Sequence, residues 1–288
     1  MNIINQTLVE NFRHQSGIIS VIAFHNTTRF RSHTDTFDLL LLIVSENTDQ
    51  SKDIFHYIKD GFRIQERWLD PVSLETWLLN GDNRNIIYWL LQGEILLDRG
   101  TYLEGIRHRL LEFPELLKEQ KLLIEFTLFL SHYVQTKEYL LEDHLLDAYS
   151  NVLESLHHWA RIVIIEEGIH PELTVWSQVR KINPGVYKLY EELTLSNETV
   201  KQRVELVLLA TEFTVMSKMK SCSSILLRII GSRVEPWSIK EIQMDQQYSE
   251  LDINLPLLLN MLVKKSLVRE VAVSFNENLS DLELRYTC

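Results

Sequence analysis

The sequence predicts an α+β protein with three successive parts: a mixed β-sheet with helices, an all-α helical bundle, and a short part of helices and strands. Two observations carry this prediction. The spacing of apolar residues changes from strand-like to helix-like along the chain and then changes again. In addition, Asp60-Gly61 separates two alternating runs, which is the strongest short-range hairpin signal. A length of 288 residues suits two or three domains.

The first part is expected to contain two buried strands, a hairpin and several helices. A short apolar run rich in β-branched residues indicates a buried strand, and both turn positions of the hairpin need positive φ. An amphipathic helix is expected around Phe12. The expected strands are 17–24, 36–44, 54–59, 62–68 and 94–97, and the expected further helices are 71–79 and 84–91.

The middle part is expected to be helical throughout. Apolar residues recur at helical spacing over 115–133, 140–167 and 199–220. Gly168 follows the long middle helix, where it can end that helix in a left-handed conformation. Long helices with short connections indicate an up-down bundle.

The last part has the element order of a winged helix-turn-helix, with three helices and then two strands. The expected helices are 223–230, 237–242 and 255–265, and the expected strands are 266–273 and 282–286. Between Cys222 and Cys288, seven Lys and Arg against nine Asp and Glu give a net charge of −2. Because the third helix is almost wholly apolar, we expect a homodimer or domain-packing role there and regard DNA binding as disfavoured.

Composition narrows the classes of partner and location. The chain has 29 Lys and Arg against 40 Asp and Glu, a formal charge of −11, which disfavours generic nucleic-acid binding. The two cysteines show neither a disulfide framework nor metal-ligand spacing. No run of apolar residues is long enough for a membrane span, and the first residues lack the features of a signal peptide. We therefore expect a cytoplasmic protein with no membrane partner.

Two segments, 23–26 and 36–41, resemble the signature of polymerase-β-type nucleotidyltransferases. In that signature a strand ends in Gly-Ser, and the next strand carries two carboxylates two residues apart. Glycine lets the backbone approach a triphosphate, and carboxylates two apart on a strand face the same way. With a third carboxylate they hold two Mg²⁺ ions about 3.5–4 Å apart for in-line transfer.

The carboxylate positions of the signature fall on Thr36, Asp38 and Glu66. The resemblance implies that Asp38 and Glu66 are the catalytic and metal-binding pair, with Mg²⁺ as cofactor and Thr36 beside the nucleotide. Asp35 would point to the opposite side of a strand and is a poor substitute for the first carboxylate. Two alternatives stay open: Asp38 as a carboxylate that caps a turn, and Glu66 as a cross-strand partner for Arg or Lys.

The phosphate-binding Gly-Ser position falls on His25-Asn26. The resemblance implies that both residues bind the nucleotide, with Arg29 and Arg31 as helpers. The alternative is that His25-Asn26 forms an ordinary turn.

Over nearly its whole length the sequence resembles the nucleotidyltransferase-like proteins of Gram-positive bacteria, a family with no established reaction. The segments that carry the resemblance are 62–68, 93–99, 157–161 and 181–193. It implies a nucleotidyltransferase-like domain at 1–118, a substrate-binding-like helical domain at 119–218 and a winged-helix-like domain at 219–288. Within 157–161 and 181–193, His158, Arg161 and Lys188 are candidates for a substrate cleft; the alternative for Lys188 is an ordinary helix surface.

Two functional hypotheses follow. In the first, the protein binds an NTP with Mg²⁺ in a cleft between the first two domains and transfers a nucleotidyl group to a hydroxyl acceptor, or retains the binding and has lost catalysis. In the second, it is a regulatory or scaffold protein whose winged-helix-like part contacts a protein partner or DNA.

Overall fold

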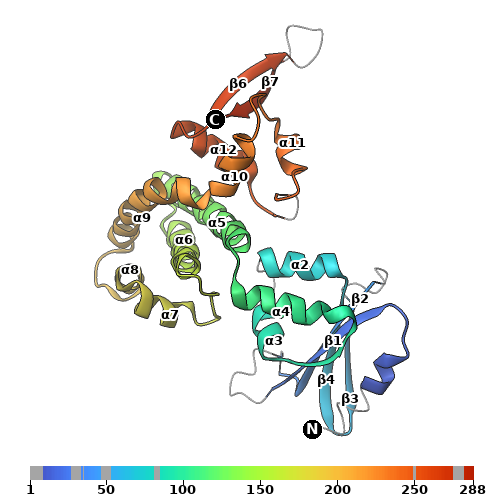
Figure 1. Ribbon diagram of the computed structural model, residues 1–288. Coiled ribbons are helices and arrows are strands. Elements are labelled where there is room, and N and C mark those ends of the chain that lie inside the picture. The colour runs from blue at the N-terminus through green and yellow to red at the C-terminus, as the bar shows by residue number, and fades with distance from the viewer. Residues whose placement is uncertain are drawn as a thin grey trace. The chain divides into compact units, whose positions relative to one another are not determined.

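The structure, a computed structural model, describes residues 9–26, 34, 36–46, 53–80, 85–248, 251–274 and 282–288 (Figure 1). The chain divides into two units, Met1–Pro114 and Glu115–Cys288. The second unit contains both the helical bundle and the last part of the chain. The domain boundaries expected at residues 118 and 218 stay predictions.

A five-stranded mixed sheet forms the centre of the first unit. Its strand order is β3-β4-β2-β1-β5, in which β2 and β4 are parallel and the other neighbours are antiparallel. The strands are β1 (Ile18–His25), β2 (Leu39–Ser45), β3 (Ile54–Lys59), β4 (Phe62–Leu69) and β5 (Glu94–Asp98).

The apolar runs of the sequence become the buried strands of this sheet, as predicted. All seven residues of β2 are buried. On one face of the sheet, residues such as Leu41 and Ile43 pack with Phe12 and Trp68. Five more elements complete the unit: α2 (Pro71–Asn80), α3 (Ile86–Gln92), the 3₁₀ turn η3 (Arg99–Thr101), α4 (Tyr102–Glu112), and the helical turn around Phe12.

The hairpin predicted at Asp60-Gly61 is confirmed. Asp60 has φ 51° and Gly61 has φ 81°, so both turn positions are left-handed. The flanking strands β3 and β4 pair antiparallel from Lys59 opposite Phe62 onward. Gly61 meets the positive φ without a Cβ, and Asp tolerates it better than most residues.

The strand expected over 36–44 begins later than predicted. Strand β2 starts at Leu39, and Thr36 lies in a turn with φ 73°. The backbone N–H of Phe37 donates to the carbonyl of Thr34 at 2.8 Å, and the Thr34 hydroxyl donates to the Phe37 carbonyl at 2.6 Å. These bonds close a turn, so Thr36 does not share the side-chain alternation of the strand.

The second unit is built around two long antiparallel helices, α5 and α6, which run side by side in Figure 1. Helices α7, α8 and α9 pack around them over a core that includes Val152, Leu156 and Leu193. The bundle helices are α5 (Glu115–Leu141), α6 (Leu145–Glu166), α7 (Val175–Ile182), α8 (Pro184–Leu195) and α9 (Val200–Cys222).

Two helix boundaries in this region differ from the predicted ones, and helix α7 lies in none of the predicted helix ranges. The first long helix was expected to end at 133 and the second to begin at 140, but α5 continues to Leu141. No Gly or Pro interrupts 133–141, and the chain turns at Asp143, which has φ 61°. Helix α4, in the first unit, was not predicted either. The left-handed Gly168 after α6 is confirmed, with φ 73°.

The last part of the chain contains three helices followed by a two-stranded antiparallel sheet. Trp237, before the second of these helices, also forms an isolated antiparallel bridge with Tyr286. The elements are α10 (Ser224–Ile230), α11 (Ile239–Gln243), α12 (Leu255–Lys264), β6 (Arg269–Ser274) and β7 (Leu282–Thr287).

The apolar character of α12 reflects its buried face. Leu255, Leu258 and Leu262 are fully buried, whereas Asn260 and Lys264 are exposed. The apolar composition of this helix is therefore explained by packing and carries no information about DNA. The expectation that nucleic acid is not a partner now depends on the charge balance alone and stays a prediction.

Within the described ranges, no helix combines the length and the apolar character that crossing a membrane requires. Cys222 is buried and Cys288 exposed, and both are free thiols.

Candidate functional site

The candidate nucleotide site lies where β1 ends and β2 begins. His25, the last residue of β1, pairs with Leu39, the first residue of β2. The next residue, Asn26, donates its backbone N–H to the Asp38 carbonyl at 3.0 Å and its side-chain Nδ2 to the Phe37 carbonyl at 3.3 Å. The sheet therefore holds 25–26 and 37–38 together, as the sequence signature requires.

Asp38 is exposed and is fixed to strand β4. Its Oδ2 accepts the backbone N–H of Arg63 at 2.9 Å, and its own backbone N–H donates to the Arg63 carbonyl at 2.9 Å. These bonds join Asp38 to the neighbouring strand, and the turn-capping role that the sequence analysis left open stays a prediction. The second oxygen, Oδ1, has no hydrogen bond to a described residue.

An aromatic and cationic group stands beside Asp38. The Arg63 guanidinium carbon lies 5.1 Å from the centre of the Phe37 ring. The centre of the His56 ring lies 4.5 Å from the centre of the same Phe37 ring. Arg63 is exposed, and its guanidinium makes no hydrogen bond within the described residues. The arrangement presents a positive charge and an aromatic ring next to the end of β1.

Two consecutive residues at this site each have a buried polar atom that lacks a hydrogen-bond partner among the described residues. The atoms are His25 Nε2 and Asn26 Oδ1. Buried polar atoms in proteins are nearly always paired, so each of these atoms indicates a place for a ligand or water. Burial lowers the pKa of His25, although the nearby Glu94 charge acts in the opposite direction. The lowered pKa favours the neutral imidazole at neutral pH.

Glu66 lies elsewhere on the sheet and is fully engaged. In the parallel register it pairs with Leu41, so its side chain lies on the face that carries Leu39 and Ile43. Its Oε2 accepts the Tyr57 hydroxyl at 2.9 Å and its Oε1 accepts Trp68 Nε1 at 2.6 Å. Both carboxylate oxygens are therefore used. Tyr57 is a cross-strand partner, as the alternative expected, but both partners are neutral donors and neither is the expected Arg or Lys. The metal role of Glu66 stays a prediction.

The described side chains do not fit a two-metal centre. Asp38 pairs in register with Arg63, and the next β4 residue on that face is Gln65, opposite Leu40, so a neutral amide stands where a third carboxylate would be needed. Gln65 itself contacts His56 Nε2 at 3.2 Å. Among the residues that the structure describes, no group of three or more His, Cys, Asp or Glu side chains could hold a metal ion. Arg29 and Arg31, the expected helpers, lie outside the described residues.

In the second unit, the structure brings two of the three expected cleft residues together. His158 Nδ1 lies 2.7 Å from Glu125 Oε2, and Arg161 Nη1 lies 3.4 Å from Glu125 Oε1. Lys188 is not part of this cluster. It lies exposed on α8 and pairs with Glu191 and Glu192 at 3.6 and 3.2 Å, which is the ordinary helix-surface alternative.

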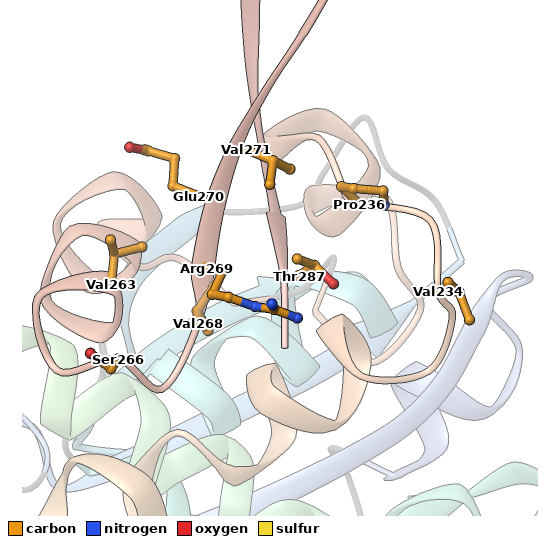
Figure 2. Close-up of a pocket in the computed structure, with 9 residues that line it drawn as sticks. All are labelled: Val234, Pro236, Val263, Ser266, Val268, Arg269, Glu270, Val271 and Thr287. Carbon is orange, nitrogen blue, oxygen red and sulfur yellow. The ribbon is translucent and has the colours of Figure 1, made fainter.

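The last part of the chain carries an open groove of about 620 Å³. Figure 2 shows Val263 of α12 on one side, Arg269 at the base and Pro236 on the other side. Its lining is mostly aliphatic, with one cation and one carboxylate. The groove contains none of the residues that the sequence signature singled out.

The sequence analysis missed Phe37, His56 and Arg63 as members of the site. Arg63 reaches Asp38 because β2 and β4 pair in parallel, although the two strands are joined through β3. A single sequence gives no signal for this register.

The sheet of the first unit is arranged as in a nucleotidyltransferase-like domain. Comparison with known proteins supports this class of domain. Residues 1–118 match the family model for a nucleotidyltransferase-like domain, and residues 119–218 match the model for a YgxA-like substrate binding domain. Both matches agree with the resemblance inferred from the sequence.

Similar proteins place the chain in a particular family. It is 34% identical over 250 residues to the uncharacterized protein YgxA of Bacillus subtilis (strain 168), which covers 87% of this chain and 85% of that protein. The crystal structure of a nucleotidyltransferase-like protein from Exiguobacterium sibiricum 255-15 superposes with a TM-score of 0.87 and 29% identity, covering 98% of this chain and 97% of that one. The chain belongs to the nucleotidyltransferase-like family that includes YgxA.

Proposed function

We propose that this protein binds a nucleotide at the end of β1, through Asn26 and the neighbouring Arg63, with His25 on the sheet face that carries Leu39, and that it acts through this binding without a two-metal transfer reaction. The observation that carries the proposal is the pair of unpaired buried atoms, His25 Nε2 and Asn26 Oδ1. They stand where the nucleotidyltransferase signature binds the triphosphate, in a domain that matches that family.

The chemistry of the unpaired groups suits a nucleotide. Asn26 Oδ1 is an acceptor and needs a donor, such as a ribose hydroxyl or a base amino group. The Arg63 guanidinium is a charged donor that matches phosphate oxygens. The Phe37 ring is half-buried, and the Arg63 guanidinium lies over it. A nucleotide base could stack on this ring if Arg63 moves to a phosphate.

The same geometry supports binding better than nucleotidyl transfer. Asp38 is the one described carboxylate of the signature that keeps an unbound oxygen, because Glu66 uses both of its oxygens on Tyr57 and Trp68. An Mg²⁺ ion bound to the nucleotide phosphates would have Asp38 as its carboxylate ligand. We therefore derive no transfer step.

The test is calorimetric titration of the full chain with ATP, GTP, CTP and UTP, each with and without Mg²⁺. A nucleotide present at a hundred times its Kd should also raise the free energy of unfolding by about 2.7 kcal/mol. Arg63→Met should weaken binding by about 10- to 100-fold, the worth of a hydrogen bond to a charged group. Asn26→Ala should weaken it as well.

Lys59→Met is the matched control. It removes the same charge from the same hairpin, but Lys59 pairs with Phe62 and so projects from the face opposite to Arg63. We expect unchanged nucleotide affinity in this variant. Absence of binding for all four nucleotides, or equal affinity in Arg63→Met and the parent chain, would refute the proposal.

The last part of the chain is, in this proposal, a winged-helix-like domain. Its order of three helices and two strands supports the assignment, and so does the Trp237–Tyr286 bridge, which adds a short third strand position beside β7. The test is retention of the chain on duplex DNA at low salt. Retention that is lost in a Lys264→Ala, Lys265→Ala variant would show that this domain binds DNA.

A further inference from the structure

Strand β6, in the last part of the chain, has an open edge. It pairs with β7 on one side, and the bridge formed by Trp237 lies on the far side of β7, so the order across the sheet is Trp237, β7, β6. No described residue pairs with the other side of β6. This edge is therefore available to another extended chain.

The backbone groups on the open edge belong to Glu270 and Ala272. Tyr286 of β7 exchanges both of its backbone hydrogen bonds with Trp237, at 2.8 Å each, so its N–H and carbonyl point away from β6. Glu270 lies opposite Tyr286. Because hydrogen-bonded and non-hydrogen-bonded pairs alternate along an antiparallel ladder, the N–H and carbonyl of Glu270 point away from β7. The same holds for Ala272, two residues later, and neither residue has a backbone partner on that side among the described residues.

Strand β6 lacks the features that commonly keep an edge strand from pairing. Those features are a proline, a β-bulge, or charges placed along the strand. No proline occurs in β6, and its register with β7 runs without a shift from Arg269 to Ser274. Its two charges lie together at its start, and the residues that follow them, 271–273, are all apolar. The strand is thus suited to pairing along its open edge.

The groove of about 620 Å³ lies at the base of the same strand. Arg269 and Val271 of β6 line it together with Val263 and Val268, as Figure 2 shows. Exposed aliphatic side chains gather in and beside the two-stranded sheet, and such a gathering next to an open edge indicates a surface that a partner covers. The exposed aliphatic residues are Val234, Val273, Leu282 and Leu284.

We propose that this partner is a second copy of the chain, whose own β6 pairs antiparallel with β6 across a two-fold axis and completes a four-stranded sheet. Outward-facing residues must meet each other in such a pairing, so Glu270 of one copy exchanges hydrogen bonds with Ala272 of the other. Val271 then faces its own counterpart on the axis. Val273 of one copy stands opposite Arg269 of the other, at the base of its groove.

The distribution of charge favours a second copy as the occupant. In this register no charged side chain of β6 lies opposite a like charge, whereas a neighbouring register would set the two Glu270 side chains against each other. The uncharged end of each strand instead meets the mostly aliphatic groove of the other copy. The segment between Cys222 and Cys288 has seven Lys and Arg against nine Asp and Glu, a net charge of −2 out of −11 for the chain. Two copies therefore repel each other little through this part.

Sedimentation equilibrium of the full chain measures the self-association. We expect a mass that rises with concentration towards twice the 33.9 kDa of one chain. Ala272→Pro removes the outward N–H, so each Glu270–Ala272 pair loses one of its hydrogen bonds, and the dimer should weaken about tenfold or more. A proline whose missing N–H faces outward is tolerated in an edge strand, and circular dichroism checks that the variant is folded. Ala272→Ser keeps the N–H and is the matched control, with unchanged dimer affinity.

Cysteine cross-linking tests the register. In a Cys288→Ser background, Val271→Cys sets two thiols opposite each other at a non-hydrogen-bonded pair, whose Cα atoms lie about 4.5 Å apart, within disulfide range. Val273→Cys is the control, because its two thiols would be offset by four residues, about 13 Å along the strands. Cys222 is buried and stays in both variants. Mild oxidation should join the Val271→Cys chains and leave the Val273→Cys chains single.

Three results would overturn the proposal. The mass of a single chain at every concentration would leave the edge to a strand of another protein. A dimer that survives Ala272→Pro with unchanged affinity, or one that gives no Val271→Cys cross-link, would use a different surface. Amide hydrogen exchange should be slow at Glu270 and Ala272 in the dimer and fast in the diluted monomer. Slow exchange in the monomer as well would mean that another part of the same chain covers the edge.

The inference goes beyond the proposed function and is tested separately from it. It concerns a surface in the second unit, whereas the nucleotide site lies in the first. Arg63→Met should leave the self-association unchanged, and Ala272→Pro should leave the nucleotide affinity unchanged. Either proposal can therefore fail while the other stands.

Discussion

Replacing Glu66 separates a structural carboxylate from a metal ligand. The two side-chain oxygens accept hydrogen bonds from Tyr57 and from Trp68, which is 8% exposed. Glu66→Ala leaves both donors without an acceptor. A hydrogen bond to a charged group is worth about 1.5–3 kcal/mol, and because water can reach the half-buried Tyr57, we expect a total loss of about 2–4 kcal/mol. That is a large share of the 5–15 kcal/mol of a typical domain.

The assay is urea and thermal unfolding of the full chain, with nucleotide titration of the folded variants. Glu66→Ala should lower Tm by roughly 10 °C. Glu66→Gln should lower it by about half as much, because the amide keeps one acceptor oxygen. Nucleotide affinity should change in neither. Glu10→Ala, a substitution at an exposed carboxylate in the same unit, should stay within about 0.5 kcal/mol of the parent chain.

A Glu66→Ala variant with unchanged stability, and with nucleotide binding that no longer responds to Mg²⁺, would refute this reasoning. Such a result would mean that the carboxylate is held for a metal ion and that its contacts with Tyr57 and Trp68 contribute little.

Three further substitutions or titrations test local features. Gly93→Ala would place its Cβ 2.8 Å from the Ile22 side chain and should lower the free energy of unfolding by about 1–3 kcal/mol in urea titrations. Thr36→Asn should raise it by about 0.5–1 kcal/mol, because Asn tolerates the left-handed φ of 73° that a β-branched residue disfavours. The pKa of Glu241 is lowered to about 2, chiefly by the backbone N–H of Ser238. Its contribution to stability should therefore be complete above its ordinary pKa and be lost as the pH falls towards 2, as a carboxyl ¹³C titration of the folded chain would show.

Features with a local physical cause could be predicted from the sequence. The Asp60-Gly61 turn depends on two residues that accept positive φ, and both have it. Strand β2 follows from a run of apolar residues that could only be buried. The pairing of His25 with the start of β2 follows from two buried strands joined by a polar connection, and the structure places it at Leu39.

What the sequence could not supply is the position of side chains around Asp38. That position depends on the parallel pairing of β2 with β4, a contact between segments separated by the β3 strand. The pairing puts Arg63 beside Asp38 and turns Glu66 to the other face. The alternation of side chains within 62–68 predicts that Glu66 shares a face with Ile64 and Trp68. It does not predict which residues of the neighbouring strand β2 lie on that face.

The turn at Thr36 and the hydrogen bonds of Glu66 both depart from the arrangement that a shared metal ion needs. Two carboxylates share a metal only if the strand aims both at one point, and a residue in a left-handed turn before the strand is aimed elsewhere whatever its charge. An aspartate at position 36 would therefore not rebuild the pair. The backbone and both side chains depart from the metal-binding pattern at once. The site retains its unpaired acceptor, its imidazole and the Arg63 charge, and these are the groups through which we propose that it binds a nucleotide.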